Sequence, residues 1–298
     1  MLPARGRKGR RVAVRDEPGI EPASTKSESW SDSYRLVAAE KWKAKSAVMG
    51  SAVTQALVEY AAPQPGMQVI DLASGTGEPA ISLAKRVAPG GTVTATDLSV
   101  ELLELAAERA RKKNLPNFVI RPADVHELPF PDRTFDLASC RFGVMYFQRV
   151  NRALSETRRV LKSGARACFA VWGTSEQPYW QTTMKIVHQH VGGSMLERSG
   201  EDIFCFAASG SLAEALVAAG FRDVEESERN LPWTWRGTAE EVFEYARAVS
   251  TPFRPMLERV REEQWPGILA EVHTAIDRYR VGEEIRFGAR VILASGRA

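Results

Sequence analysis

The sequence predicts an α/β fold, a doubly wound and mostly parallel sheet with helical cap insertions. Short β-branched apolar runs alternate with amphipathic helical segments from about residue 67 onward, and this alternation requires right-handed crossovers and parallel strands. A glycine turn at residues 75–77 joins the first run to a helix, and acids lie at or just beyond the ends of three runs. Ligands of such sheets bind at the carboxyl ends of the strands, where these acids fall.

The predicted elements alternate regularly along the first two thirds of the chain. The expected strands cover residues 67–72, 92–97, 117–122, 134–140 and 164–172. The helices between them are expected at 77–87, 100–113, 149–161 and, as a single short turn, near 125–128.

The last third contains longer helical stretches. A helix expected at 211–220 begins with a capping box, Ser211 to Glu214, and ends at Gly220. A sixth strand is expected at about 222–229 and a closing strand at 284–294. Between these two strands the sequence predicts helices at about 238–249, 254–263 and 265–279.

Three regions are expected along the chain. Residues 1–29 lack apolar periodicity, contain three prolines and are rich in arginine, which predicts a disordered basic tail. Residues 30–62 predict an N-terminal helical cap. Residues 63–298 form the main domain, with helical insertions at about 177–208 and 237–281.

Charge and composition favour a cytoplasmic enzyme. The net charge is +3, but six basic residues and no acid lie within residues 1–15, so the rest of the chain carries about −3. The tail is either a solvated extension or an electrostatic tether for RNA or an anionic surface. No apolar run approaches the ~18 residues that span a bilayer. The three cysteines and four histidines lack metal-ligand spacing, so no metal site is expected.

The segment 69–80 carries the most specific motif. Gly75 and Gly77 allow a ligand to approach the backbone, and the helix that follows offers unpaired N–H groups. Asp71 precedes Gly75 by four residues and would repel a pyrophosphate, so the expected ligand carries a positive charge. The dinucleotide fingerprint G-x-G-x-x-G/A fits formally, yet in that motif the first glycine follows the strand directly.

An apolar run followed by D-x-x-x-G-x-G resembles the first motif of the class I S-adenosylmethionine-dependent methyltransferases, whose cofactor carries an ammonium and a sulfonium. A second strand ends in Asp97, 26 residues after Asp71, and residues 124–136 are similar to the family segment D-x-x-x-L-P-F-x-D-x-x-F-D. The resemblance implies a seven-stranded Rossmann-like sheet. Its closing strand would be antiparallel and would insert between the fifth and sixth strands.

The resemblance also implies which residues bind S-adenosylmethionine. Asp97 would accept both ribose hydroxyls, Asp124 would accept the adenine amino group, and the Val125 backbone would pair with a ring nitrogen. The expected set is Asp71, Ala73, Gly75, Gly77, Asp97, Leu98, Asp124, Val125 and Cys140.

Two further groups have alternative roles. Tyr34, Trp42 or Lys45 of the cap would lie near the cofactor, or these side chains pack on the core. Arg141 should avoid the sulfonium because like charges repel. It would instead form a salt bridge or bind a carboxylate of the substrate.

The methyl acceptor is expected to be a small molecule, aromatic or lipid-tailed, rather than a nucleic acid. Residues 139–147 lack the N/D-P-P-Y/F signature of amino-directed nucleic-acid methylation and resemble the ubiquinone/menaquinone-biosynthesis-like branch. Tyr146, Trp172 and Trp180 could wall an apolar pocket. The helix expected at 178–191 carries an apolar stripe, so it belongs to the core or forms a lid over the acceptor.

We therefore expect methyl transfer from S-adenosylmethionine to a small-molecule acceptor. The sulfonium is already a good leaving group, so the main task is to align acceptor, methyl and sulfur. If a proton must be removed, His126 is the candidate base, although a histidine beside a turn is usually structural. The alternatives are an RNA methyltransferase tethered by the tail and a catalytically silent S-adenosylmethionine-binding partner protein.

Overall fold

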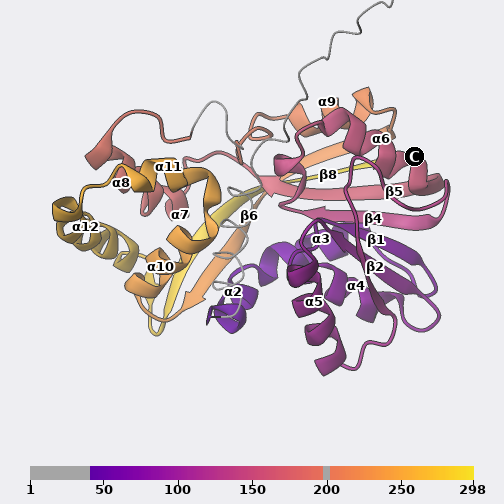
Figure 1. Cartoon of the computed structure of the whole chain (residues 1–298), viewed down its shortest axis with the longest axis horizontal. Helices are drawn as coiled ribbons and strands as arrows, with labels where there is room; N and C mark the ends of the chain where they lie inside the picture. Colours follow the sequence, from indigo (N-terminus) through magenta and orange to yellow (C-terminus); the bar gives the residue numbers. More distant parts are fainter. Residues whose placement is uncertain (1–40, 197–201) are drawn as a thin grey trace, which may run out of the picture.

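The computed structural model describes residues 41–196 and 202–298 and contains one mixed sheet (Figure 1). The strand order is β3-β2-β1-β4-β5-β8-β6, and the short β7 pairs with β8. Strands β1 to β5 run parallel, whereas β8 is antiparallel to β5 and β6, which confirms the predicted fold class and the place of the closing strand. The strands are β1 (Gln68–Leu72), β2 (Thr92–Asp97), β3 (Phe118–Pro122), β4 (Phe135–Arg141), β5 (Leu161–Trp172), β6 (Arg222–Arg236), β7 (Arg280–Val281) and β8 (Glu284–Arg297).

Helices cover both faces of the sheet (Figure 1). The parallel strands are therefore buried on both sides, as their apolar sequences require, and residues 69–72 of β1 are fully buried. One face carries α3 (Ser51–Ala61), α4 (Ala80–Val87) and α5 (Val100–Lys112), and the other carries α6 (Val150–Val160) and α9 (Ser211–Ala218).

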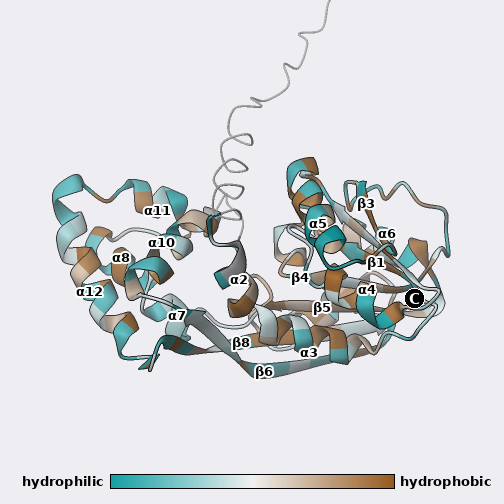
Figure 2. Ribbon diagram, turned by 90° about the horizontal axis from the view of Figure 1, so that it is seen from below, coloured by the Kyte–Doolittle hydropathy of each residue, from teal (hydrophilic) through white to brown (hydrophobic). Residues whose placement is uncertain are grey.

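Strands β6 and β8 continue past the sheet as a two-stranded ribbon that carries a helical lobe (Figures 1 and 2). The sequence predicts that β6 ends near residue 229, but its pairing with β8 continues to Arg236. Pro232 is tolerated because β6 is an edge strand. The lobe consists of α7 (Pro178–Gln181), α8 (Met184–Val191), α10 (Ala239–Val249), α11 (Arg254–Glu258) and α12 (Trp265–Asp277).

Three helices differ from their predicted form. The segment near 125–128 is a turn, and the helix expected at 254–263 ends at Glu258. The helix expected at 178–191 is broken into α7 and α8 at Thr182 and Thr183, whose hydroxyls donate to backbone carbonyls one turn earlier at 2.8 and 2.6 Å. Such hydroxyl bonds compete with the regular helical pattern.

The amino end of α9 is capped from a neighbouring strand. The predicted capping box is wrong, because the Ser211 hydroxyl donates to the Ala208 carbonyl at 2.7 Å. Glu226 of β6 instead accepts hydrogen bonds from the N–H groups of Gly210 and Ala213, at 2.6 and 2.9 Å. A carboxylate at this end is also stabilised by the helix dipole.

The amino-terminal helix α2 (Lys43–Met49) joins the sheet to the lobe. Trp42, just before it, packs on Trp235 of the ribbon with 5.5 Å between ring centroids. Lys45 forms an ion pair with Glu241 of α10. These two cap residues therefore contact the ribbon and the lobe.

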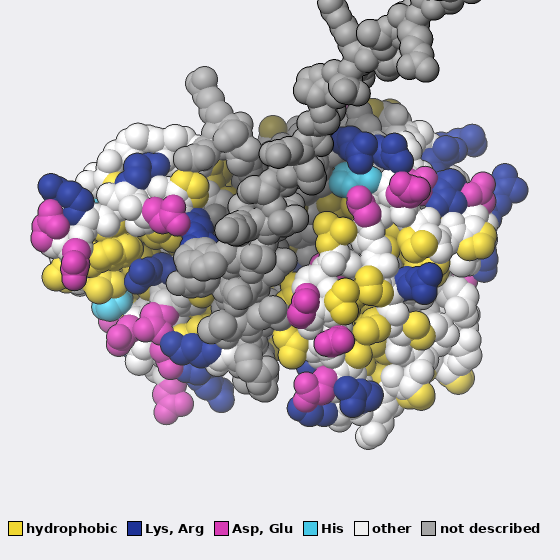
Figure 3. Space-filling view, in the orientation of Figure 1, with side chains coloured by type: hydrophobic (Ala, Val, Ile, Leu, Met, Phe, Trp, Pro, Cys, Tyr) yellow, Lys and Arg dark blue, Asp and Glu magenta, His cyan; other side chains and the backbone are white. Residues whose placement is uncertain are grey.

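The surface carries both signs of charge. On the face that Figure 3 presents, acidic and basic side chains are interspersed over the helical lobe and over the part that contains the sheet. Tyr34 and the expected basic tail lie outside the described residues. Within residues 41–196 and 202–298, no helix is both long and apolar enough to cross a membrane.

Substitution of Trp180 in α7 tests whether aromatic packing holds the helical lobe on the ribbon of β6 and β8. Its side chain is 5% exposed and stacks on Phe253 with 5.2 Å between ring centroids. This burial favours the core interpretation of the segment 178–191 over the lid. We expect Trp180→Ala to lower the free energy of unfolding by about 3–5 kcal/mol, because removal of a large buried ring leaves a cavity.

Urea denaturation measures this loss. Val217→Ala, at a position on α9 that is 60% exposed, is the control and should change the stability by less than about 0.5 kcal/mol. A Trp180→Ala protein as stable as the wild type would show that the ring is not part of the core.

Candidate active site

The loop after β1 is folded back onto the end of β2. The Ser74 N–H donates to the Thr96 carbonyl at 2.8 Å, and the Gly75 N–H donates to the Asp97 carboxylate at 2.8 Å. Ala73 and Gly75 have φ values of +50° and +51°, in the left-handed region that L residues rarely adopt. The second strand thus holds a strained loop at the carboxyl edge of the sheet.

The two glycines of this loop have different tasks. A Cβ on Gly75 would have no atom within 4 Å, so its backbone is open to a ligand. A Cβ on Gly77 would lie 2.8 Å from Ile81 and 2.9 Å from Ala106, so this glycine allows α4 to pack on α5. Both were expected to admit a ligand, and the geometry supports that task for Gly75.

Asp71 lies at the end of β1 with no exposed surface. Its carboxylate accepts hydrogen bonds from the hydroxyl of Ser74, at 2.7 Å, and from that of Ser139 of β4. Burial raises the pKa of Asp71 to about 7, while the two hydroxyls and the charge of Arg141 act in the opposite direction. A nearby cation would stabilise the ionised form of this acid.

Asp97 ends β2 and is hydrogen-bonded through both carboxylate oxygens. Besides the Gly75 N–H, it accepts the N–H of Ser99 at 3.0 Å. Each oxygen has further lone pairs, so ligand donors can bind the same carboxylate. The next residue, Leu98, is 76% exposed and offers an apolar surface beside it.

The turn after β3 brings Asp124, Val125 and His126 to the same edge. The Asp124 carboxylate accepts the His126 N–H at 2.8 Å, which holds the pKa of Asp124 below its usual value, and it lies 2.6 Å from Nδ1 of His126. Nε2 of His126 accepts the N–H of Arg149 at 3.3 Å. Both ring nitrogens therefore have partners, and the histidine stabilises the turn.

The segment after β4 touches the loop after β1. A Cβ on Gly143 would lie 2.6 Å from Cβ of Ala73 and 2.8 Å from Sγ of Cys140, so only glycine allows this contact. Phe142, beside it, has a φ of +58°. Cys140 is fully buried, and burial raises the pKa of its thiol well above the usual value. Any contact of Cys140 with a ligand would therefore be made by its backbone.

Aromatic side chains continue from this segment toward the helical lobe. Phe142 stacks on Trp172 of β5 with 4.4 Å between ring centroids and 15° between ring planes. Trp172 in turn meets Trp233 of β6 at 4.9 Å and Trp180 at 5.5 Å. The indole N–H groups of Trp180 and Trp233 are buried without a hydrogen-bond partner. We call these four residues the aromatic cluster.

The sequence identified only part of this cluster. The sequence does not identify Phe142 or Trp233 as site residues. Trp233 reaches the site only through the extension of β6 beyond the sheet, which the sequence does not predict. Tyr146 is half-buried and lies in a 3₁₀ turn, Val144–Tyr146, on the connection that follows Phe142.

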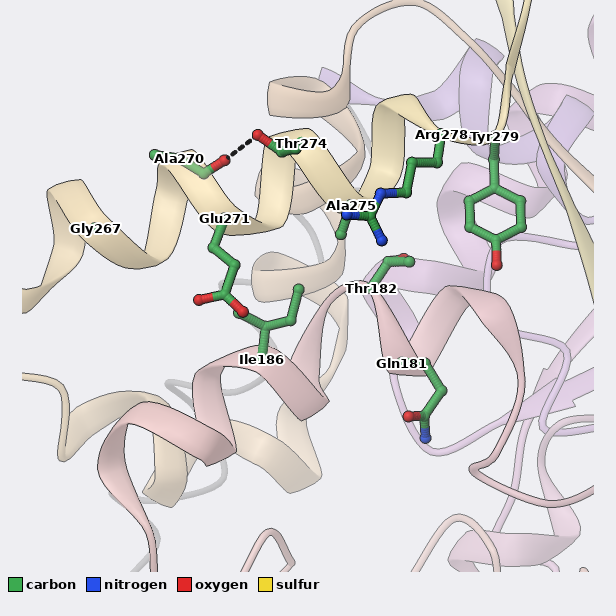
Figure 4. Close-up of a pocket in the computed structure, with 10 residues that line it drawn as sticks. All are labelled: Gln181, Thr182, Ile186, Gly267, Ala270, Glu271, Thr274, Ala275, Arg278 and Tyr279. Carbon is green, nitrogen blue, oxygen red and sulfur yellow. Dashed lines mark hydrogen bonds between the residues drawn. The ribbon is translucent and has the colours of Figure 1, made fainter.

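A separate pocket of about 660 Å³ lies within the helical lobe (Figure 4). Figure 4 shows it between α12, which contributes Glu271 and Thr274, and the α7–α8 segment, which contributes Gln181 and Ile186; Arg278, just after α12, also lines it. None of its lining residues belongs to the loops at the sheet edge. The pocket is therefore distinct from the candidate active site.

Known proteins resemble this chain in the region that contains the three acids. A family model for the methyltransferase domain matches residues 70–169. The chain is 31% identical over 177 residues to the ubiquinone/menaquinone biosynthesis C-methyltransferase UbiE of Cupriavidus taiwanensis, a match that covers 56% of this chain and 72% of that protein. The protein of the same name from Bordetella avium is 41% identical over 103 residues, but the match covers 35% of this chain and 40% of that protein.

Solved structures share the fold. The crystal structure of the YcgJ protein of Bacillus subtilis has a TM-score of 0.54 at 19% identity, with 82% of this chain and 97% of that chain covered. The strand order, the motif positions and the match to the Cupriavidus protein agree with one another. This chain belongs to the class I S-adenosylmethionine-dependent methyltransferases.

Proposed function

We propose that this chain transfers a methyl group from S-adenosylmethionine to a small-molecule acceptor held between the sheet edge and the helical lobe. The observation that carries the proposal is the grouping of Asp71, Asp97 and Asp124 around one glycine loop, at the carboxyl ends of adjacent strands. The cofactor presents two positive groups, ribose hydroxyls and an adenine amino group. Carboxylates are suitable partners for all of these.

The adenosine half of the cofactor fits the β2–β3 side. The open backbone of Gly75 allows close approach, and the Asp97 carboxylate has lone pairs left for the ribose hydroxyls. Leu98 offers an exposed apolar surface to the adenine ring. Asp124 and the Val125 backbone would then bind the polar edge of the ring.

The methionine half fits the β1–β4 side. Ala73 and Cys140 lie where the two loops meet, and the buried Asp71 is the acid at the end of β1. The bound cofactor would supply the methyl group, with a neutral thioether as the leaving group. The residues of this chain contribute alignment, which can supply roughly 7–11 kcal/mol of the barrier reduction.

No base is assigned to the reaction. His126 is engaged through both ring nitrogens, by Asp124 and by the N–H of Arg149, so it is not free to take a proton from the acceptor. Cys140 is buried and its raised thiol pKa disfavours a thiolate. This arrangement favours an acceptor that needs little help to lose a proton.

The aromatic cluster supports a planar acceptor. The Cupriavidus relative is named for ubiquinone and menaquinone biosynthesis, and we extend a quinone-type ring to this chain as the proposed acceptor class. A planar ring could extend the stack of Phe142 on Trp172, and the unpaired indole N–H of Trp233 would suit a ring oxygen.

Labelled donor tests the acceptor class. Small-molecule fractions incubated with methyl-labelled S-adenosylmethionine and the protein should yield a labelled low-molecular-weight product. Label found in RNA would favour a nucleic-acid methyltransferase. Donor binding without any labelled product would favour a silent binding protein.

Removal of the Asp97 carboxylate tests the cofactor. We expect Asp97→Ala to weaken S-adenosylmethionine binding by about 1.5–3 kcal/mol, as for lost hydrogen bonds to a charged group. Isothermal titration calorimetry measures the change, and thermal melting confirms that the variant is folded, because Asp97 also holds the loop through Gly75.

Glu258→Ala, on the far helical lobe, is the charge-matched control and should leave donor affinity unchanged. Equal affinities for wild type and Asp97→Ala would remove Asp97 from the ribose role. Tight NADH binding by the wild type would overturn the choice of cofactor.

The raised pKa of Asp71 predicts that donor binding depends on pH. Burial raises this pKa from 3.8 to about 7, so the carboxyl is partly protonated at neutral pH. A bound cation favours the ionised form, so donor affinity should rise as the pH increases through about 7. Asp71→Asn should bind the donor more weakly above this pH and lose most of the dependence.

The free energy of unfolding should change with pH in the direction opposite to donor affinity. The folded pKa lies above the unfolded one, so the contribution of Asp71 is fully present below about pH 4 and is lost as the pH rises through about 7. Denaturation and donor titrations on both sides of neutrality check the two slopes. Identical slopes in the wild type and Asp71→Asn would show that Asp71 does not titrate in this range.

A further inference from the structure

A guanidinium lies partly buried at the carboxyl end of β4. Nη1 of Arg141 donates to the Thr54 hydroxyl at 2.8 Å and to the Gly50 carbonyl at 3.3 Å, both at the amino end of α3. A Cβ on Gly50 would lie 2.8 Å from Nη1, so the missing side chain makes room for the guanidinium. The fold therefore places a half-buried cation at the sheet edge.

Arg141 forms no ion pair with the described residues 41–196 and 202–298. Its two hydrogen-bond acceptors are neutral, and its Nε is buried without any partner. Burial lowers the pKa of Arg141, although the charges of Glu78 and Asp71 act against this. Partial desolvation of a guanidinium without an anionic partner is unfavourable, and an anionic ligand would relieve that cost.

The residues around Arg141 place it in the part of the site that would hold the methyl donor, S-adenosylmethionine. Residues 139 and 141 share one face of β4, and the hydroxyl of Ser139 binds the Asp71 carboxylate. Glu78 of the glycine loop is also near enough to influence the guanidinium. Phe142, the next residue, stacks on Trp172 and so belongs to the aromatic cluster.

One group of the donor is not matched by the three acids. Its ammonium, sulfonium, hydroxyl and amino groups suit carboxylates, whereas its amino-acid carboxylate is an anion that acids repel. We infer that Arg141 binds the methionine carboxylate of S-adenosylmethionine, an assignment that rests on the proposed function. The unpaired Nε–H supplies one donor, and a guanidinium binds carboxylates with forked, charge-assisted hydrogen bonds.

Open volume exists beside this position. Thr54, the hydroxyl partner of Arg141, and Glu78 both line a pocket of about 230 Å³ between α3 and α4. Arg141 itself is not part of this lining, which also contains Lys85 and Arg86. Another cation at the loop, Arg109, is already engaged through Nη1 with the Thr76 hydroxyl at 3.0 Å and with the Thr76 carbonyl. Arg141, whose Nε has no hydrogen-bond partner, is therefore better placed than Arg109 to bind an anionic ligand.

The sequence predicts that Arg141 forms a salt bridge or binds a carboxylate of the substrate, and both roles fit the structure less well. A salt bridge would need a carboxylate in contact with Arg141, and none of the described residues provides one. A substrate carboxylate would have to approach from the aromatic cluster, whose Phe142 ring centroid lies 5.9 Å from Cζ of Arg141, whereas the hydrogen bonds of the guanidinium go to α3 on the Asp71 face of β4.

The decarboxylated analogue of S-adenosylmethionine tests the inference, because it lacks only the anion in question. Calorimetry should show that the wild type binds S-adenosylmethionine about ten- to hundredfold more tightly than the analogue. Arg141→Met should lose about this factor for S-adenosylmethionine and bind the analogue as well as the wild type does. Arg141→Lys, which keeps the charge without the fork, should show an intermediate loss and serves if the methionine variant does not fold.

Arg158→Met is the matched control. Arg158 also has a buried, unpaired Nε, but it packs against Gly220 beside α9, on the opposite helical layer. This variant should leave the affinities for both ligands unchanged, and melting temperatures are recorded for every variant.

Two outcomes would overturn the inference. An equal loss of affinity for both ligands would make Arg141 structural. Unchanged donor affinity with a raised KM for the acceptor would make it a substrate-binding residue. Failure of the wild type to bind S-adenosylmethionine at all would instead contradict the proposed function, which the Asp97→Ala titration tests independently.

Discussion

The site depends on the way the loop after β1 is held against β2. Backbone hydrogen bonds from Ser74 and Gly75 to the end of β2 keep the loop in place, although Ala73 adopts a positive φ. Strain of this kind persists only where the surroundings over-determine the conformation. Because the loop covers the strand end, Asp71 is sealed beneath it, and hydroxyls replace water as its hydrogen-bond donors. Asp71, the acid of the motif, is therefore a buried carboxyl group with a raised pKa, and it does not lie exposed at the rim of the ligand site.

The exit of β4 separates two environments. Arg141 is bonded to α3 on the side of Asp71, while Phe142 stacks on Trp172. Adjacent residues of one segment thus serve a polar, charged half and an aromatic half. A cation close to a sulfonium would be unfavourable by itself. A carboxylate between them would attract both cations and weaken their mutual repulsion, and the donor carries such a group.

The aromatic half is made from distant parts of the chain, with Trp180 supplied by the helical lobe. Helices from two separate segments pack together in the helical lobe, since α12 contacts α8 as well as α10. The ribbon of β6 and β8 brings Trp233 to Trp172, and α2 ties the lobe to the rest through Trp42 and Lys45. The family fold accounts for the sheet and its loops.

The sequence by itself determined the features that depend on neighbours along the chain. Strand 92–97 was predicted at the bounds that the structure shows, and the helix 100–113 was predicted to within one residue, because periodicity and turn residues are local signals. The acids of the motif follow from the same logic. They lie at the ends of strands, and parallel strands end at one edge.

Only the tertiary structure decided which groups meet across the fold. The cap of α9 comes from Glu226, the room for Arg141 comes from Gly50, and the partner of Trp172 comes from an extended β6. The threonine hydroxyls that accompany the break between α7 and α8 bond within their own turn, yet the apolar stripe there still predicted one helix. Contacts between segments far apart in sequence carry no periodic signal, so packing alone selects them.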